Sequence, residues 1–412
     1  MTRQTTGRRP YDVVLYGASG FVGRQTAAYF AQHASTQARP LTWALAGRNA
    51  EKLAAVQHHC GAGAAQAGIV LADADDARAL QALARAAHVV LSTAGPFDRY
   101  GSKLVAACVN AGTHYVDITG ETPWVRGLID RHHAQAKRQG TRIIPCCGFD
   151  SVPSDLGAWL LTQAMLRSHG EACVDVKAGF SLRGGLNGGT LASALNMIET
   201  GQNKLLDDPF LLNPRSRKRR LIEAHRDPRG PHHDPDFRAW MAPFVMGPVN
   251  TRVVRRSAAL LGYGDDFRYQ EYLRVGAGPL AGALATSLSV GMALSQAALT
   301  LAPLRHAAQR LAPGPGAGPS VAAMDGGCFR CELVGRDAHG HRLRARVADQ
   351  GDPGNRATTK MVCEAALCLA LDLDHLPGGP SQGGLLTPAS GLGDALVARL
   401  RSAGMTLESL PG

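Results

Sequence analysis

The sequence predicts an α/β protein with two domains: a doubly wound parallel sheet in the first third, then a second α/β domain with an open mixed sheet. The chain has 412 residues, which favours two domains. Apolar runs alternate with helical segments over residues 11–146, and alternating strand-like runs recur further on. Continuous apolar strands separated by helices are typical of a parallel sheet covered on both faces.

Each element of the first domain is predicted from its local pattern. Apolar, β-rich runs predict strands at residues 11–16, 41–46, 68–72, 88–93, 114–118 and 142–146. Helices are predicted between them, from the first loop to about residue 33 and at 51–59, 75–86, 100–111 and 122–139. Ligands bind at the carboxyl ends of parallel strands, so we expect the functional residues in the loops that follow the strands.

The first of these loops, residues 17–23, is rich in glycine and reads GASGFVG. Gly17 allows a tight turn, Gly20 lets the backbone approach a pyrophosphate, and Gly23 lets the following helix pack closely on the strand. The free N–H groups at the helix start would hold the pyrophosphate. The spacing is GxxGxxG rather than the commoner GxGxxG, and glycines also serve plain turns. Its place between a strand and a helix predicts a Rossmann dinucleotide site.

The end of the second strand indicates which dinucleotide binds. An Asp or Glu there would bind the ribose 2′-hydroxyl of NAD, whereas Arg accommodates the 2′-phosphate of NADP. Here Arg48 ends the strand, Lys52 follows one turn later, and no acid is present. A guanidinium can bind the phosphate through two hydrogen bonds. We therefore predict NADP as the cofactor, the alternative being a surface arginine that caps a loop.

Two later loops complete the predicted cofactor groove. Asp73, after the third strand, either lies near the adenine or caps the next helix. The small-residue turn after the fourth strand leaves room for the nicotinamide ribose, although it could be an ordinary turn. The predicted cofactor-binding residues are Gly17, Ser19, Gly20, Phe21, Val22, Gly23, Arg48, Lys52, Asp73, Thr93, Ala94, Gly95 and Pro96.

A set of motifs along nearly the whole chain resembles the saccharopine dehydrogenase-like oxidoreductases, and more closely their trans-acting enoyl reductase branch. In order these are GASGFVG (17–23), ALAGR (44–48), STAGPF (92–97), YGSKLVAAC (100–108), HYVDITGE (114–121), PCCGFDSVPSDLG (145–157), GDPG (351–354), KMVCEAALCLALD (360–372) and GLLTPASGLGD (384–394). The resemblance implies an NADP-binding domain, a second α/β domain and lipid-like acyl substrates. By this resemblance, the reaction of some family members is reduction of an enoyl group carried by a polyketide synthase.

The predicted reaction is hydride transfer from NADPH to an apolar acyl or carbonyl substrate, either a small molecule or a carrier-bound acyl group. A general acid is expected at the strand ends near the nicotinamide. Glu121 and Asp150 follow the fifth and sixth strands, and Tyr100 is a weaker candidate. Each carboxylate could instead hydrogen-bond loop backbone. Alternative functions are a saccharopine-type amino-acid oxidoreductase, for which no compact Arg and Lys cluster is evident, and a non-catalytic NADP(H)-binding, lipid-associated protein.

The domain boundaries are predicted at residues 1–150, 151–350 and 351–412. In the second domain, Ser154 or Asp155 is expected to cap a helix that runs through residue 167, and a glycine-rich turn is expected at 184–189. Strands are expected at 174–182, 267–275, 327–337 and 342–347, and a helix at 190–200. The last segment should form helices that return toward the first domain.

An apolar insert at about residues 276–304 carries no charged side chain. As a helix it would be long enough to cross a bilayer, since roughly twenty residues suffice. A stripe of small residues along it would permit close helix packing. Three alternatives are open: a buried helix or homodimer interface, a peripheral membrane contact, and a true membrane span.

The net charge of +11 suggests anionic partners, with one basic cluster at residues 215–220. Nucleic acid is not expected, because no recognised nucleic-acid-binding motif accompanies the charge. Cys328 and Cys331 have CxxC spacing without a second pair, so no metal site is predicted. The polar N-terminus lacks a secretory pattern, and most cysteines lie in apolar runs. We therefore expect a cytoplasmic protein, with membrane contact, if any, at the inner face.

Overall fold

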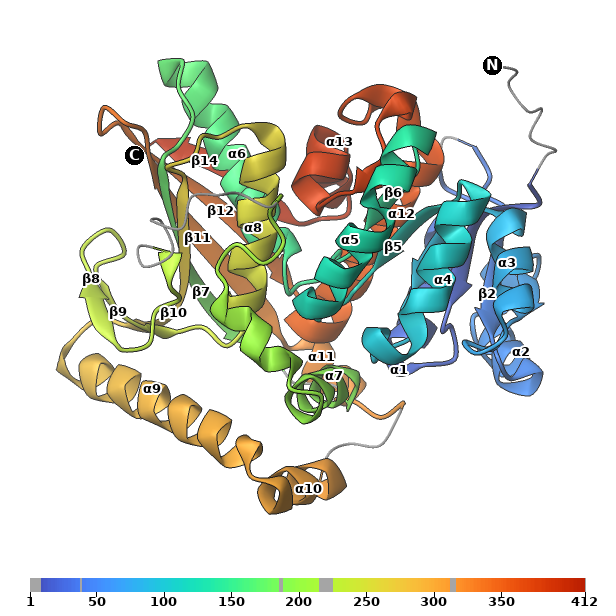
Figure 1. Ribbon diagram of the computed structural model, residues 1–412, viewed down its shortest axis with the longest axis horizontal. Coiled ribbons are helices and arrows are strands. Elements are labelled where there is room, and N and C mark those ends of the chain that lie inside the picture. Colours follow the sequence, from blue (N-terminus) through green and yellow to red (C-terminus); the bar gives the residue numbers. More distant parts are fainter. Residues whose placement is uncertain (1–8, 38, 185–187, 215–224, 312–315, 412) are drawn as a thin grey trace.

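The computed structural model describes residues 9–37, 39–184, 188–214, 225–311 and 316–411. The basic cluster at 215–220 and residues 185–187 of the glycine-rich turn predicted at 184–189 lie outside the described residues. Two seven-stranded sheets organise the molecule, and Figure 1 shows them side by side, with helices between and around them. The predicted fold class, a parallel sheet followed by a mixed sheet, is confirmed.

The first sheet has the strand order β13-β6-β5-β4-β1-β2-β3, and every neighbouring pair is parallel. Val13, Val14 and Leu15 of the interior strand β1 are almost fully buried, because helices cover both faces. The strands are β1 (Tyr11–Tyr16), β2 (Trp43–Gly47), β3 (Gly68–Leu71), β4 (Ala87–Ser92), β5 (His114–Asp117), β6 (Arg142–Ile144) and β13 (Gly384–Leu385). The connecting helices are α1 (Phe21–His33), α2 (Ala50–His59), α3 (Ala77–Ala86), α4 (Phe97–Ala111) and α5 (Thr122–Gln139).

The second sheet has the order β14-β12-β11-β7-β10-β9-β8, in which β7 and β10 are parallel and the other pairs antiparallel. Its strands are β7 (Asp175–Arg183), β8 (His232–Asp234), β9 (Ala239–Pro243), β10 (Arg268–Gly276), β11 (Cys328–Arg336), β12 (Arg342–Gln350) and β14 (Thr406–Pro411). Helices α6 (Val152–His169) and α8 (Gly247–Leu261) pack on this sheet and on each other. Further helices are α7 (Gly188–Glu199), α9 (Pro279–Thr300), α10 (Ala302–Leu311) and α11 (Val321–Asp325).

The C-terminal segment connects both sheets. Helix α12 (Thr358–Leu371) packs on α1, β4 and β5, and α13 (Pro388–Ser402) packs on α12 and α6. Between and after these helices, β13 extends the first sheet and β14 the second. The segment therefore belongs to neither domain alone, and its two short strands were not anticipated from the sequence.

The expectation that Ser154 or Asp155 caps the helix now identified as α6 is wrong. Ser151 is the N-cap residue and Pro153 lies in the first turn, where its missing N–H is harmless. Both predicted caps are buried inside the helix with distant partners. Ser154 Oγ donates to Glu271 Oε2 at 2.7 Å, and Asp155 Oδ2 accepts from the Ala389 N–H at 2.8 Å. These side chains tie α6 to β10 and α13.

A glycine controls the packing of α4 on α5. A Cβ on Gly101 would lie 2.6 Å from Cζ2 and 2.9 Å from Cη2 of Trp124. The indole is buried, and its N–H donates to Ser102 Oγ at 2.9 Å. Because the ring is rigid and held at one end, it cannot bend away from a methyl group as a flexible chain would.

Replacing Gly101 with alanine should therefore lower the free energy of unfolding by about 1–3 kcal/mol, the usual cost of overpacking. The matched control is Gly291→Ala in α9, where nothing lies within 4 Å of the new methyl group. Helix propensity alone should make that variant more stable, by up to about 1 kcal/mol. Chemical denaturation of both variants tests this, and equal stability of Gly101→Ala and wild type would contradict the packing argument.

Candidate active site

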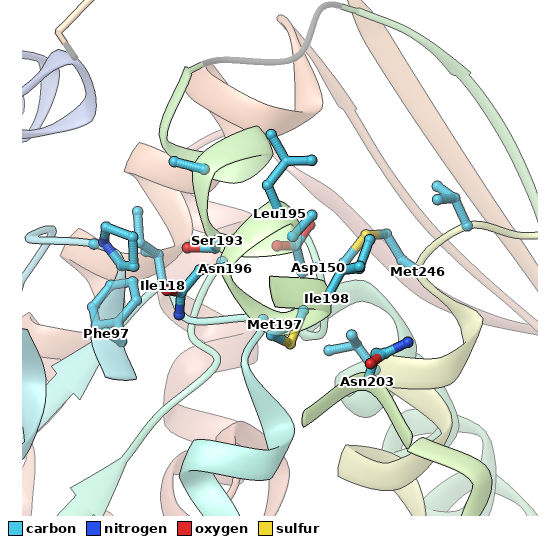
Figure 2. Close-up of a pocket in the computed structure, with 18 of the residues that line it drawn as sticks. Phe97, Ile118, Asp150, Ser193, Leu195, Asn196, Met197, Ile198, Asn203 and Met246 are labelled. Atoms are coloured by element: carbon cyan, nitrogen blue, oxygen red, sulfur yellow. The ribbon is translucent and has the colours of Figure 1, made fainter. Parts of the chain in front are cut away.

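A cavity of about 1710 Å³ lies where the carboxyl edge of the first sheet meets the second domain. The first domain contributes the loops after β1 to β6. The second domain contributes α7, the segment that leads into α8, and one face of α9. Figure 2 shows part of this wall, with α7 residues such as Ser193, Leu195 and Ile198 at its centre.

The glycine loop after β1 forms one end of the cavity. Gly17 has a φ of +84°, which favours glycine, and a Cβ there would lie 2.9 Å from the Ala94 nitrogen. The turn therefore packs directly against the loop after β4. Gly20 is the N-cap of α1, and no side chain in the described part of the protein caps it. The first N–H groups of α1 are thus available to an anion.

Gly23 does not line the cavity. A Cβ on it would lie 2.1 Å from the Gly17 carbonyl oxygen, so only glycine lets α1 begin this close to the turn. Its position fits close packing of the helix rather than contact with a ligand.

Arg48 lines the cavity at the end of β2, where its side chain is exposed. Among the described residues, no hydrogen bond or ion pair engages its guanidinium. Lys52 lies outside the cavity wall, in the first turn of α2, and its N–H donates to Asn49 Oδ1 at 2.8 Å. Asp73 lines the cavity, and its Oδ1 also accepts from the Asp75 N–H at 2.9 Å. A phosphate on the adenosine ribose would therefore meet Arg48.

The structure brings most of the predicted site residues to this one cavity. Those that line it are Gly17, Ser19, Gly20, Phe21, Val22, Arg48, Asp73, Thr93, Ala94, Gly95, Pro96, Tyr100 and Asp150. Those that do not are Gly23, Lys52 and Glu121.

Asp150 stands at the centre of the cavity wall. In the view of Figure 2 it lies between Phe97 and Ile118 of the first domain and Met246 of the second. A Cβ on Gly120 would lie 3.4 Å from Asp150 Oδ2, so this glycine leaves the carboxyl accessible. Burial raises the pKa of Asp150 to about 6, because little water remains to solvate the charged form. Within the described chain, no hydrogen bond occupies the carboxyl group.

Glu121 serves the neighbouring helix instead. Its two carboxylate oxygens accept the N–H groups of Phe97 and Asp98, each at 2.9 Å, which caps the start of α4. The Ser193 hydroxyl also bonds to it, although burial dominates and raises its pKa. The side chain thereby fixes the loop that contains Gly95 and Pro96 and does not reach the cavity.

Two buried carboxyl groups near the cavity were not predicted from the sequence as site residues. Asp117, at the end of β5, accepts the N–H groups of Thr119 and Cys146 at 3.0 Å each, and so holds two neighbouring loops together. Glu271 on β10 lines the cavity and accepts from Ser154, Asn250 and Tyr269. Burial raises the pKa of each to about 7. An acid ending a strand was a usable signal for Asp117, whereas two of the three partners of Glu271, Ser154 and Asn250, are distant in the chain.

Beyond Asp150 the cavity wall becomes largely apolar. The side chains come from α7, from the short helix Gln202–Asp207, from the start of α8 and the residues before it, and from α9. The sequence could not place these segments together. They are Leu195, Met197, Ile198, Leu206, Phe244, Val245, Met246, Val249, Met292, Ala293, Ala297 and Leu299. Asn196, Asn203 and Gln296 supply uncharged polar groups. The charged residues that line this part of the cavity are Glu199, Asp207, Arg226, Asp227, Arg229, Arg252 and Glu271. The apolar part of this wall is suited to a hydrocarbon chain.

Comparison with known families supports an oxidoreductase. The profile of the saccharopine dehydrogenase NADP-binding domain matches residues 13–144. A Mycobacterium tuberculosis relative is 42% identical over 98% of this chain and 99% of its own, and the name trans-acting enoyl reductase is provisional for that protein. A trans-acting enoyl reductase of Mycobacterium bovis is 39% identical over 97% of this chain and 97% of its own.

A solved structure supports the fold as well. Apo saccharopine dehydrogenase (L-Glu forming) from Saccharomyces cerevisiae matches 97% of this chain and 99% of its own, with a TM-score of 0.53 and 15% identity. At that identity the likeness concerns the fold alone.

The position of Arg48 predicts how the chain distinguishes NADPH from NADH. Arg48→Ala should weaken NADPH binding about tenfold to a hundredfold, because a charge-assisted hydrogen bond contributes about 1.5–3 kcal/mol. NADH affinity should hardly change. Lys52→Ala removes a nearby positive charge outside the cavity and should have a much smaller effect. Fluorescence titration measures all four affinities, and equal losses for NADPH and NADH in Arg48→Ala would contradict this role.

Proposed function

We propose, from the premise that this chain belongs to the trans-acting enoyl reductases of the saccharopine dehydrogenase-like family, that it reduces an enoyl group on a carrier-bound acyl chain. The family makes the chain an NADP-dependent oxidoreductase. What we propose beyond the family is the enoyl substrate, its carrier and the roles of individual residues.

The observation that carries this proposal is the continuity of the cavity. It runs from the glycine loop past Asp150 into the apolar wall of α7, α8 and α9. Ligand pockets usually measure about 300–1,000 Å³, so a cavity of about 1710 Å³ has room for a dinucleotide and an acyl chain together. Asp150 lies where the two would meet.

The residues at the first end fit the cofactor. The α1 N-terminus at Gly20 would hold the pyrophosphate, and Arg48 the 2′-phosphate. Thr93, Ala94 and Gly95 are small enough for the nicotinamide ribose to pass along the loop after β4. Bound NADPH would supply a hydride to the β-carbon of an α,β-unsaturated thioester.

Asp150 would supply the matching proton. In its protonated form it donates from its carboxyl oxygen to the α-carbon of the substrate, and the carbon–carbon double bond becomes single. The carboxylate left behind regains a proton from water at the cavity mouth. A pKa near 6 keeps a useful protonated fraction close to neutral pH, which a solvated aspartate would lack.

A cationic side chain at the rim of the cavity supports a carrier-bound acyl substrate. Arg229 lines the cavity and is exposed, and no ion pair engages it among the described residues. Acyl carriers present their cargo on a phosphopantetheine arm, whose phosphate would suit this guanidinium. The acyl chain could then reach inward while the carrier stayed outside.

The reaction itself is tested by following NADPH oxidation with a panel of enoyl thioesters, keto thioesters and saccharopine. Turnover of enoyl thioesters alone is the expected result. Turnover of only keto thioesters or of saccharopine would reject the proposed substrate class.

Asp150→Asn should lower the rate of enoyl reduction about a hundredfold or more while leaving NADPH affinity unchanged. The wild-type rate should fall as the pH rises through about 6, since the acid is lost above its pKa. The variant should lack this pH dependence. Glu121→Gln is the matched control: it disturbs the loop after β4 but should keep the decline near pH 6. A variant with the wild-type pH profile would show that Asp150 is not the acid.

Arg229→Ala should raise the KM for coenzyme A thioesters, which carry the pantetheine phosphate, by about tenfold. The KM for N-acetylcysteamine thioesters, which lack phosphate, should stay the same. Steady-state kinetics on both thioesters measure this difference. Equal changes for the two substrates would argue against phosphate recognition at the rim.

A further inference from the structure

Helix α9 exposes an unusually large apolar face. It has 22 residues, about 33 Å in length at the usual helical rise, and carries no charge. Leu280 is 83% exposed, Leu294 65% and Val290 53%. In Figure 1 the helix lies along one edge of the molecule, outside both sheets. The alternative of a helix buried in the core of the single chain is therefore wrong.

The opposite face of α9 belongs to the substrate cavity. Ala285 and Ser289 are buried, and Ser289 and Met292 line the cavity. Near the start of the helix, Gly282 packs against the Trp240 ring, where a Cβ would lie only 2.8 Å from an indole carbon. The helix is thus fixed to the protein on one side, which leaves the leucine face pointing outward.

The connectivity of the chain excludes a membrane crossing by α9 alone. The helix follows β10, and β11 comes after α10 and α11. Both strands pair with β7 in the same sheet. A crossing would need a return crossing, yet α9 is the one helix in the described ranges long and apolar enough to span. α10 has ten residues, including Arg305 and Arg310. Any membrane contact by α9 would therefore run along the bilayer surface rather than through it.

The charge around this face favours an anionic surface. No aspartate or glutamate occurs in the sequence from residue 272 to 324. Of the three arginines there, Arg274 pairs with Glu332 at 3.1 Å and Arg305 donates to the Leu299 and Thr300 carbonyls, whereas Arg310 lies on the exposed surface of α10. Arg310 and His306 on α10 are exposed. The whole chain carries a net charge of +11. An apolar helix face with cationic neighbours is the composition that binds acidic lipid headgroups and the acyl boundary beneath them.

We propose that the outward face of α9, together with α10, docks on an anionic phospholipid membrane, with α9 lying in the interface. This interaction is independent of the proposed reaction, since it needs neither cofactor nor substrate. It would place the apolar end of the cavity at the lipid surface, because one helix forms both the cavity wall and the membrane contact.

The test is flotation of the full chain with vesicles of phosphatidylcholine alone or of phosphatidylcholine with phosphatidylglycerol. We expect flotation with the anionic vesicles, weaker at high salt. The double variant Leu280→Glu/Leu294→Glu should lose at least tenfold in vesicle binding. The matched control Leu166→Glu/Leu182→Glu adds the same charge at exposed leucines elsewhere and should bind like the wild type. Unchanged NADPH affinity shows that each variant is folded.

Three outcomes would overturn the proposal: no flotation of the wild-type chain, equal binding to both vesicle types, or equal binding by the α9 variant and the control. A wild-type dimer in solution that the α9 variant converts to monomer would also overturn it, because a second copy would then cover this face. None of these outcomes bears on enoyl reduction, so the two proposals fail separately.

Discussion

The proposed chemistry depends on the partial burial of one carboxyl group where the two domains meet. Asp150 follows β6 of the first sheet, but α7 and the segment before α8 form much of the cavity wall around it. Burial raises its pKa to about 6. The first domain thus supplies the position of the acid, and the second domain contributes to the wall that surrounds it.

The parts of the site that the sequence predicts obey local rules. A turn with positive φ requires Gly17, and the close start of α1 requires Gly23, whatever the rest of the chain does. Arg48 ends a strand whose place beside β1 follows from the βαβ order. Strand ends in a parallel sheet meet at one edge, so the loops that hold Thr93 and Asp150 could be assigned to one site before any contact was known.

What the sequence does not predict depends on contacts between distant residues. Glu121 and Asp150 carry the same local signal, an acid after a strand, yet one caps α4 and the other faces the cavity. Ser154 was predicted as a helix cap because serine is a preferred N-cap residue. The helix instead begins before Ser154, with Pro153 in its first turn, and the Ser154 hydroxyl bonds to Glu271. The strands β13 and β14 pair with β6 and β12, which lie far from them in the chain. Local sequence propensity cannot distinguish these alternatives, because each one depends on a contact with a residue that is distant in the chain.

The composition of α9 makes sense only when both of its faces are considered. A helix that merely closed the cavity would carry polar residues on its outer face, as amphipathic surface helices do. A helix buried in the core would have partners all round. α9 has small and apolar residues on both faces, with most of its surface uncovered. Exposed leucines cost solubility and are retained where a surface covers them. The cavity explains the inner face, and the proposed contact with an anionic membrane would account for the outer one.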